Sequence, residues 1–387
     1  MRKFFEEWSD LKKSYINQLW SKLIAIFFSI ITGALIARML GPGDIGKIAY
    51  VSALTAILAP IASFGVRESY SLLICESNPQ KGLLETAFCG KLLGAFLISF
   101  ILVPLSILSG STTIICLMIF SLLATLFRAS DVIEAELLHV EKGNKIATLG
   151  LLQSVFALIL SLIGLLSKAS ILYFGAIPIF HELVRCFLLV KNSTVSSFKS
   201  LINGFSLVSL KALIIKGFPL MLSNLSIVLY LKSDLVMLEW LKGADSVGIY
   251  SVASKSCEIL YIAPLLLCQN LLPKVGKEFN SKQSPDSTLA VTRQLYQSSW
   301  ILGLGITGII ISLFPTLISF IYGSQFIYSS QLVLFLSPIG FAVSLNYATN
   351  IWFKLNDLQY FVVIKSISGA VFNIIFNLLL IPEFGII

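Results

Sequence analysis

Apolar runs of roughly 20 residues recur along the whole chain, and each is long enough to cross about 30 Å of hydrocarbon as a helix. Short polar breaks, or Gly and Pro, separate the runs. Only 12% of the 387 residues are charged, whereas about 25% is usual for a soluble domain. The chain is therefore expected to be an all-α, polytopic membrane protein, and no connection is long enough to hold a soluble domain.

The polar breaks predict about 11 transmembrane helices. The first fifteen residues are charged and amphipathic, which suits a lead segment that lies on the membrane surface. The predicted helices span 16–39, 47–66, 83–108, 111–127, 146–166, 171–190, 211–241, 246–272, 298–321, 329–351 and 360–381.

Lys and Arg are concentrated in alternate connections, and the positive-inside rule assigns these connections to the cytoplasm. The odd-numbered connections, such as 109–111 and 322–326, are nearly bare of charge. We therefore expect a multi-pass protein with a cytoplasmic N-terminus. The charged positions include Arg2, Lys3, Lys12, Lys13, Arg67, Arg128, Lys142, Lys145, Lys274, Lys277 and Lys354.

Residues 41–47, GPGDIGK, match the first part of the phosphate-binding pattern G-x-x-x-x-G-K. That pattern continues with Ser or Thr and lies between a strand and a helix, whereas this chain has Ile48 and places the segment between two membrane helices. We therefore predict a tight helix–helix turn. Gly41 would cap the first helix, Pro42 would stop it, and Asp44 would be the N-cap of the second.

The same turn occurs twice. LGPGDIGKIAYVSA at 40–53 aligns with KGADSVGIYSVASK at 242–255 at a constant offset, and both glycines of the turn are kept. Internal duplication on this scale is common in transporters. Because each half is expected to hold six helices, an even number, the two halves would share one orientation about an axis along the membrane normal.

The repeat predicts an N-terminal lobe at 1–200 with helices one to six, and a C-terminal lobe at 201–387 with helices seven to eleven. The final run, LLLIPEFGII, is similar to the segment LLSKASILYFG that leads from helix five into helix six. We therefore expect the second lobe to lack its last helix, the twelfth, and the C-terminus to lie on the non-cytoplasmic side.

Several segments together resemble one family. They are LIARMLGPGDIGKIAY at the first turn, PIASFGVRES closing helix two, EKGNK before helix five, and SDLVMLEWLKGADSVGIYSVASK at helices seven and eight. The chain is similar to the polysaccharide transporter (O-antigen flippase) family of the multidrug/oligosaccharidyl-lipid/polysaccharide exporter superfamily. The run from Asp234 to Gly243 is the most recognisable part.

This resemblance implies two six-helix lobes around a central cavity, and a flippase that works by alternating access. It would move undecaprenyl-diphosphate-linked repeat units of an O-antigen or other polysaccharide from the cytoplasmic to the periplasmic leaflet of the bacterial inner membrane. The bilayer and the lipid-linked oligosaccharide are the implied partners, with a glycan polymerase and a chain-length regulator as further candidates. No nucleic acid, cofactor or metal is implied.

A charge within the membrane is costly, so it normally faces a cavity or a partner. Basic groups near or within the predicted helices are therefore candidates for binding the diphosphate and sugars: Lys22, Lys91, Lys255, Arg67 and Arg38. For the first two, the alternative is a side chain that reaches the headgroups. For the two arginines, a headgroup anchor is the favoured alternative.

Asp234 and Glu258 are the acids that we predict for ion coupling, since no nucleotide site is found to supply energy. Glu258 lies three residues after Lys255, so the alternative is a neutralised pair on one helix face. His181 beside Glu182 suits a hydrogen-bonded core histidine better than a proton relay.

Three other functions are compatible with the sequence. A multidrug exporter of the same superfamily would have the same fold, although the excess of intramembrane Lys over acid favours an anionic substrate. A membrane glycan polymerase or glycosyltransferase would be an enzyme, but such enzymes usually carry a large extracytoplasmic loop, which is absent from this pattern. An inactive remnant is the third alternative. A transporter rather than an enzyme is therefore predicted.

Overall fold

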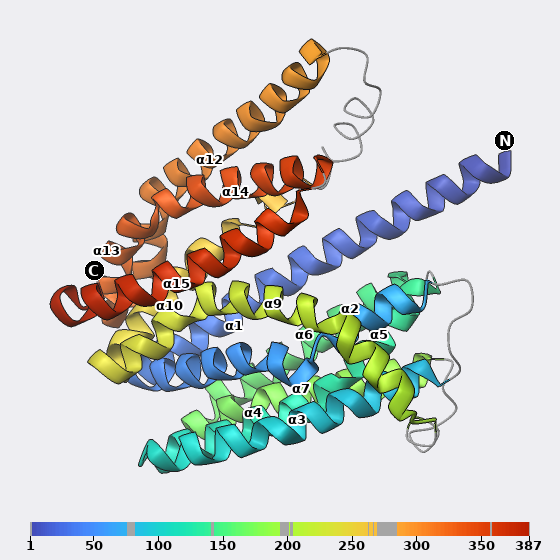
Figure 1. The fold of residues 1–387 in the computed structure, drawn as a ribbon. Helices are drawn as coiled ribbons and strands as arrows, with labels where there is room; N and C mark the ends of the chain where they lie inside the picture. The colour runs from blue at the N-terminus through green and yellow to red at the C-terminus, as the bar shows by residue number, and fades with distance from the viewer. Residues whose placement is uncertain are drawn as a thin grey trace. The chain divides into compact units, whose positions relative to one another are not determined.

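The computed structural model describes residues 2–75, 82–140, 143–193, 201, 204–261, 263–265, 267–268, 285–356 and 358–386 (Figure 1). Side chains are described from residue 24 onward, apart from those of 25, 26, 143, 144, 259, 285–291 and 359. Within these ranges every regular element is a helix, which confirms the all-α class.

The helices follow the predicted runs closely. The elements are α1 (Arg2–Ser63), α2 (Val66–Leu73), α3 (Leu83–Leu108), α4 (Thr112–Phe127), the 3₁₀ helix η1 (Arg128–Ser130), α5 (Asp131–His139), α6 (Gly143–Leu166), α7 (Ile171–Asn192), α9 (Leu207–Lys242), α10 (Ala244–Leu260), α12 (Pro285–Tyr322), η2 (Ser324–Phe326), α13 (Ile327–Leu336), α14 (Pro338–Leu355) and α15 (Gln359–Phe384).

In the described part of the chain, 8 helices are long and apolar enough to span a membrane, or 9 if the bent pair α13 and α14 forms one span. The pair bends by 46° around Ser337. The first two predicted spans both overlap Phe27–Ser63, which Gly41 divides into two helices. The predicted span 246–272 is described as a helix over α10, and 269–272 lie outside the described residues.

The turn at Gly41 is tighter than predicted. Gly41 has φ 80° and ψ 175°, which breaks the helix at a single residue, and the second helix resumes directly. That backbone conformation is essentially restricted to glycine. Asp44 is not the N-cap that we predicted: it already lies in the helix and pairs with Lys47 at 2.9 Å. Gly243 repeats the geometry with φ 84° and ψ 175°, one residue before α10 begins.

The chain forms two compact units, to which α1 and α9 both contribute. Unit 1 comprises Met1–Leu40 and Val51–Lys232, and unit 2 comprises Gly41–Tyr50 and Ser233–Ile387.

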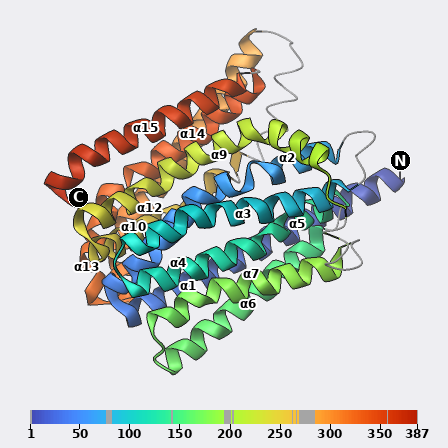
Figure 2. The ribbon, with the colours of Figure 1, turned by 60° about the horizontal axis from the view of Figure 1, so that its bottom comes forward.

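Unit 1 is built on antiparallel helix pairs. α4 packs on both α3 and α7, and α6 packs on α7, so that α3, α4, α7 and α6 run side by side (Figure 2). α2 packs against α3 and α5. The largest side chains of the core beneath these short helices are Tyr70, Phe88, Ile133 and Leu137, all of which are buried.

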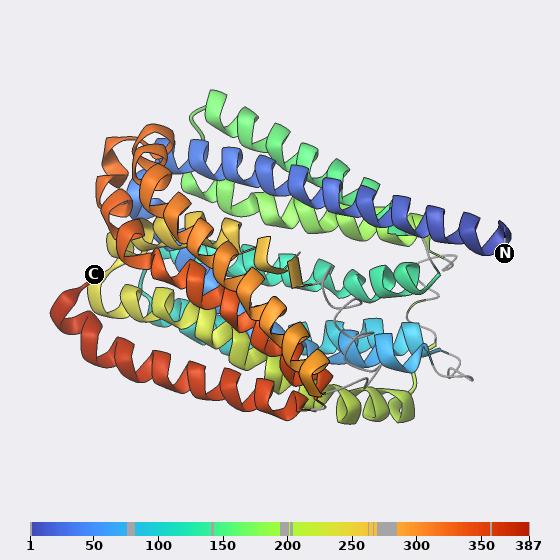
Figure 3. The same cartoon turned by 90° about the horizontal axis from the view of Figure 1, so that it is seen from above.

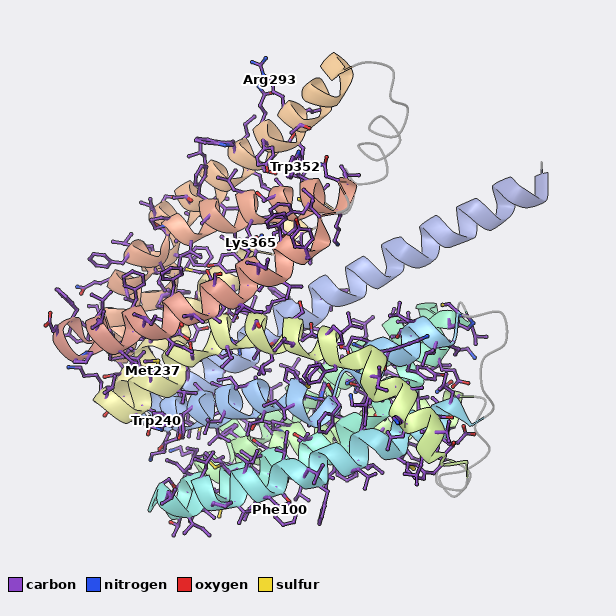
Figure 4. All side chains as sticks on the ribbon, in the orientation of Figure 1. Phe100, Met237, Trp240, Arg293, Trp352 and Lys365 are labelled. Carbon is purple, nitrogen blue, oxygen red and sulfur yellow. The ribbon has the colours of Figure 1, made fainter. Side chains whose placement is uncertain are left out.

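The outer surface of unit 1 is apolar, as a bilayer requires. Phe100 projects from α3 with 66% of its surface exposed (Figure 4), and Phe96 packs edge-on against it. An exposed apolar face of this kind would be an aggregation hazard in water, whereas lipid solvates it. The protein is accordingly a multi-pass membrane protein.

Unit 2 is centred on α12, which packs on α13 and α14, while α10 packs on α13 and α15 on α14. Its core includes Cys268, Leu295, Ala348 and Ile351. Figure 3 shows α12 and α15 in orange and red.

The two repeated turns fit into one another within unit 2. A Cβ on Gly46 would overlap the carbonyl of Ala244, and a Cβ on Gly248 would overlap the carbonyl of Pro42. The repeat aligns Gly46 with Gly248 and Pro42 with Ala244, so each turn makes the same contact with the other. The second glycine of the turn is therefore required by close packing rather than by a bound phosphate.

We expect Gly46→Ala and Gly248→Ala to destabilise unit 2 to a similar extent, by about 1–3 kcal/mol, because each methyl group would have to displace a backbone carbonyl. Thermal unfolding of the detergent-purified protein measures the effect. Gly308→Ala in α12 is the control, since no atom lies within 4 Å of its added Cβ. Melting temperatures equal to that of the control would contradict the reciprocal packing.

Candidate functional site

A cavity of about 330 Å³ lies within unit 1, where several helices meet. This volume is at the lower end of the range for small-molecule sites. Mostly small or apolar residues of α1 and α9 form part of its wall, and charged groups from α2, α3, η1 and α5 form most of the rest. The lining residues are Ala56, Ala59, Pro60, Ala62, Ser63, Arg67, Glu68, Lys91, Thr125, Arg128, Asp131, Asn224, Ile227 and Val228.

A sharp turn between α1 and α2 brings two of the charged groups to the cavity. Phe64 and Gly65 have φ values of 45° and 67°, which end α1 and redirect the chain into α2. Gly65 is so close to Gly217 of α9 that a Cβ would overlap the Gly217 carbonyl. Arg67 and Glu68 then lie in the first turn of α2, next to α9.

Glu68 and Arg67 are only partly satisfied by the protein. Asn224, two turns beyond Gly217 on α9, donates a hydrogen bond to Glu68 Oε1 at 3.1 Å. The other oxygen, Oε2, and the Nε of Arg67 are buried without a hydrogen-bond partner among the described residues. Each such atom costs about 1–3 kcal/mol. The Arg67 guanidinium is also 3.9 Å from its nearest carboxylate, that of Glu134.

Lys91 is held by a direct ion pair. Its ammonium group, on α3, donates to both carboxylate oxygens of Asp131, the first residue of α5. The two side chains are only 10% and 12% exposed. A buried charge of this kind is tolerated because it is paired. Of the three cations that line the cavity, Lys91 is therefore the one most fully neutralised by a carboxylate of the protein.

A second set of ion pairs lies beside the cavity. Arg128 donates from Nε and Nη2 to Glu182 Oε1 at 3.3 and 3.2 Å. Arg185, one turn further along α7, donates to Glu182 Oε2 at 3.3 Å and also to Glu134. Five alternating charges, from Arg67 through Glu134, Arg185 and Glu182 to Arg128, thus form one chain.

Tyr70, one turn after Arg67 on α2, is buried at the edge of this region. Burial raises the pKa of its hydroxyl well above the ordinary range, and the carboxylates of Glu136 and Glu85 raise it further. The hydroxyl therefore stays protonated and adds no charge.

The predicted substrate-binding residues fall in different places. Arg67 and Lys91 both line the cavity. Arg38 is exposed on α1 within unit 1, and Lys255 is exposed on α10 within unit 2. Lys22 lies in the part of α1 whose side chains are not described.

The two predicted coupling acids both lie in unit 2. The Asp234 carboxylate accepts hydrogen bonds from the Tyr250 hydroxyl and, at 3.0 Å, from the backbone N–H of Leu235. Glu258 accepts one from the Ser254 hydroxyl at 3.4 Å. Both acids therefore have hydrogen-bond partners on α9 or α10.

The sequence prediction missed Arg128 and Asp131 as cavity residues. The signal was present as charged residues spaced three apart on one helix face, at 128, 131 and 134, directly after an apolar run. The segment HELVR at 181–185 likewise carries Glu182 and Arg185 on one face of a membrane helix.

Lys365, which was also missed, is an intramembrane cation of unit 2. It extends from α15 toward α14, where Trp352 lies nearby (Figure 4). The side-chain oxygens of Asn346 and Asn350 each accept from its ammonium at 2.5 Å, and the Phe353 ring lies 5.8 Å away. These contacts satisfy the charge, so Lys365 is not a strong candidate for binding substrate.

The cavity is suited to an anion. Three cations and two carboxylates line it, which leaves a net charge of +1. Arginine guanidinium groups bind phosphate through two parallel hydrogen bonds. The amide of Asn224 and the hydroxyl of Thr125 can hydrogen-bond a neutral polar group. No cluster of three or more His, Cys, Asp or Glu suited to a metal occurs among the described residues.

The sequence profile of the family "Polysaccharide biosynthesis protein" matches residues 11–267, about two thirds of the chain. The chain belongs to this family. The polysaccharide-transporter resemblance seen in the sequence is thereby confirmed at the level of the family. No curated protein sequence matches the chain significantly.

The fold matches those of known transporters of the MOP superfamily. The inward-facing conformation of a multidrug resistance MATE family transporter has a TM-score of 0.73 and 13% identity, covering 92% of this chain and 88% of that one. A MOP superfamily transporter from Pyrococcus furiosus has a TM-score of 0.62 and 13% identity, with 96% and 89% covered. A MATE in complex with MaD3S has a TM-score of 0.57 and 13% identity, with 96% and 92% covered. At these identities the likeness establishes the fold alone.

Proposed function

We propose that this family member is a flippase for undecaprenyl-diphosphate-linked oligosaccharides, moving them from the cytoplasmic to the periplasmic leaflet of a bacterial inner membrane. The observation that carries the proposal is the net positive cavity inside a bundle of membrane helices. A diphosphate that crosses a membrane needs fixed positive charge at depth. Membership of a polysaccharide biosynthesis family and a transporter fold support the same function.

In this proposal Arg67 and Arg128 contact the diphosphate directly, because each is partly exposed to the cavity. Lys91 contributes positive potential while it remains paired with Asp131. Asn224 and Thr125 offer hydrogen bonds to sugar hydroxyls. The polyprenyl tail remains in the lipid, since the outer face of the protein is apolar.

The remaining site assignments are part of the same proposal. Lys22, Lys255 and Arg38 would guide the substrate, and Asp234 and Glu258 would couple its movement to an ion gradient. One charge that moves through 100 mV supplies about 2.3 kcal/mol. The predicted lobes at 1–200 and 201–387 would be the two bodies that alternating access requires. Translocation in proteoliposomes that is indifferent to proton and sodium gradients would remove the two acids from this role.

The proposal is tested by binding to undecaprenyl diphosphate in lipid nanodiscs, with undecaprenol as the uncharged comparison. The wild-type protein should bind the diphosphate and not the alcohol. Arg67→Ala should weaken binding at least about tenfold, because it removes a charge-assisted contact. Lys354→Ala, an exposed cation on α14, is the matched control and should bind as the wild type does.

Equal binding of the diphosphate and the alcohol would contradict an anion site. Normal binding by Arg67→Ala together with loss in Lys354→Ala would place the site elsewhere. In the host, deletion of the gene should abolish surface glycan display, and the Arg67→Ala variant should fail to restore it at a normal protein level.

The chief alternative is a multidrug exporter of the same fold. The net positive lining disfavours cationic drugs, which such an exporter would carry. Transport of a cationic dye that is not inhibited by added lipid-linked glycan would favour this alternative. The polymerase or glycosyltransferase alternative would be favoured instead by formation of a new glycosidic bond in the purified protein.

A further inference from the structure

Arg185 is a partly buried arginine that does not line the cavity. It lies in α7, and its side chain is 22% exposed. Nη2 of its guanidinium group donates to Glu134 on α5, and Nη1 donates to Glu182 on its own helix at 3.3 Å. The two carboxylates are therefore held by different nitrogens of one planar group.

Each of these carboxylates directs its other oxygen to an arginine of the cavity. Glu134 Oε1 is 3.9 Å from Nη2 of Arg67, and Glu182 Oε1 accepts from Arg128. Arg185 is thus the middle member of a chain whose two ends are the partly exposed cations of the candidate site. Those ends come from α2 and η1, which are separated by 54 residues of sequence.

The two ends of this chain are its most exposed members, and the two carboxylates are its least exposed. Glu182 is 6% exposed and Glu134 18%, whereas Arg67 and Arg128 are 38% and 45% exposed. The carboxylates therefore have little contact with solvent, and Oε1 of Glu182 also lies 3.9 Å from Nδ1 of His181. Three arginines share two carboxylates, which leaves one positive charge in excess within the chain.

We propose that Arg185 is a positioning residue for anion binding: its fork fixes Glu134 and Glu182, and these carboxylates fix the spacing of Arg67 and Arg128 for a ligand with two phosphoryl groups. This inference rests on the proposed function. Lysine has the same charge but only a single compact ammonium group, so it cannot reproduce the two-sided geometry. The geometric role of Arg185 can therefore be separated from its charge.

The test compares the affinities of undecaprenyl diphosphate and undecaprenyl phosphate for the wild-type protein and for Arg185→Lys in lipid nanodiscs. The wild-type protein should prefer the diphosphate, because two arginines at a fixed spacing hold two phosphoryl groups. In Arg185→Lys we expect this preference to fall at least about tenfold toward equality. Arg293→Lys, an exposed arginine of α12 (Figure 4), is the matched control and should keep the wild-type preference.

The ratio of the two affinities distinguishes positioning from a merely structural role. If Arg185 only supported the fold, Arg185→Lys would lower the active fraction and weaken both lipids equally, leaving the ratio unchanged. An unchanged ratio, or a wild-type protein with no preference, overturns the inference. If the wild-type protein binds neither undecaprenyl phosphate nor undecaprenyl diphosphate, the proposed function itself fails, which is a different outcome.

Discussion

Replacing Asp131 by alanine is expected to destabilise unit 1 by about 3–5 kcal/mol, because Lys91 would be left as a buried charge without its counter-ion. This is the magnitude observed when one partner of a buried ion pair is removed. Thermal unfolding in detergent, followed by tryptophan fluorescence, measures it. Asp44→Ala provides the control, since its pair with Lys47 is about three times as exposed as the Lys91–Asp131 pair and should contribute less than about 1 kcal/mol.

The double variant Lys91→Met with Asp131→Asn distinguishes the cost of an unpaired buried charge from the cost of lost side-chain packing. It removes both charges together, so it should be more stable than Asp131→Ala alone. The same variant removes one cation and one carboxylate, so the cavity lining keeps its net charge of +1, and we expect it to bind undecaprenyl diphosphate more tightly than Arg67→Ala does. A single variant as stable as the wild type would show that Lys91 finds another counter-ion.

Replacing Gly65 by alanine is expected to have a comparable effect, about 3 kcal/mol or more. Alanine would be strained at φ 67°, and its Cβ would overlap the backbone of Gly217. We expect a large loss of monodisperse protein in size-exclusion chromatography. Gly150→Ala in α6 is the matched control, because no atom lies within 4 Å of its added Cβ.

Gly65→Ala should also impair ligand binding in the fraction of the protein that remains monodisperse. Arg67 and Glu68 follow the turn directly, and Asn224 contacts Glu68 from the helix that the turn packs against. Separation of α2 from α9 would move all three groups. Normal yield and normal affinity for undecaprenyl diphosphate would together show that the turn is not required to place them.

Most helices were predictable because the membrane imposes a length and a composition on each one. The fourth span was predicted to end at residue 127, where the apolar run ends, and α4 does end at Phe127. The prediction did not include the helical continuation through η1 and α5 to His139. The charged residues of that continuation have partners on other helices, which allows it to stay helical.

The candidate site was only partly predictable for the same reason. Arg67 and Lys91 stand out as cations near or within apolar runs, and both line the cavity. The ion-pair partners in and beside the cavity come from distant segments: Asp131 lies 40 residues after Lys91, and Glu182 lies 54 residues after Arg128. Helical periodicity places residues on a face, but it does not specify which faces meet.

The reciprocal packing of the two repeated turns has a consequence for how the chain arose. Each turn accepts the backbone of the other at an equivalent position, which is the property of an isologous interface, where one patch meets a second copy of itself. A half-length ancestor with this turn would have been able to pair with an identical molecule. Fusion of two such copies would then have preserved the contact while the rest of each half diverged.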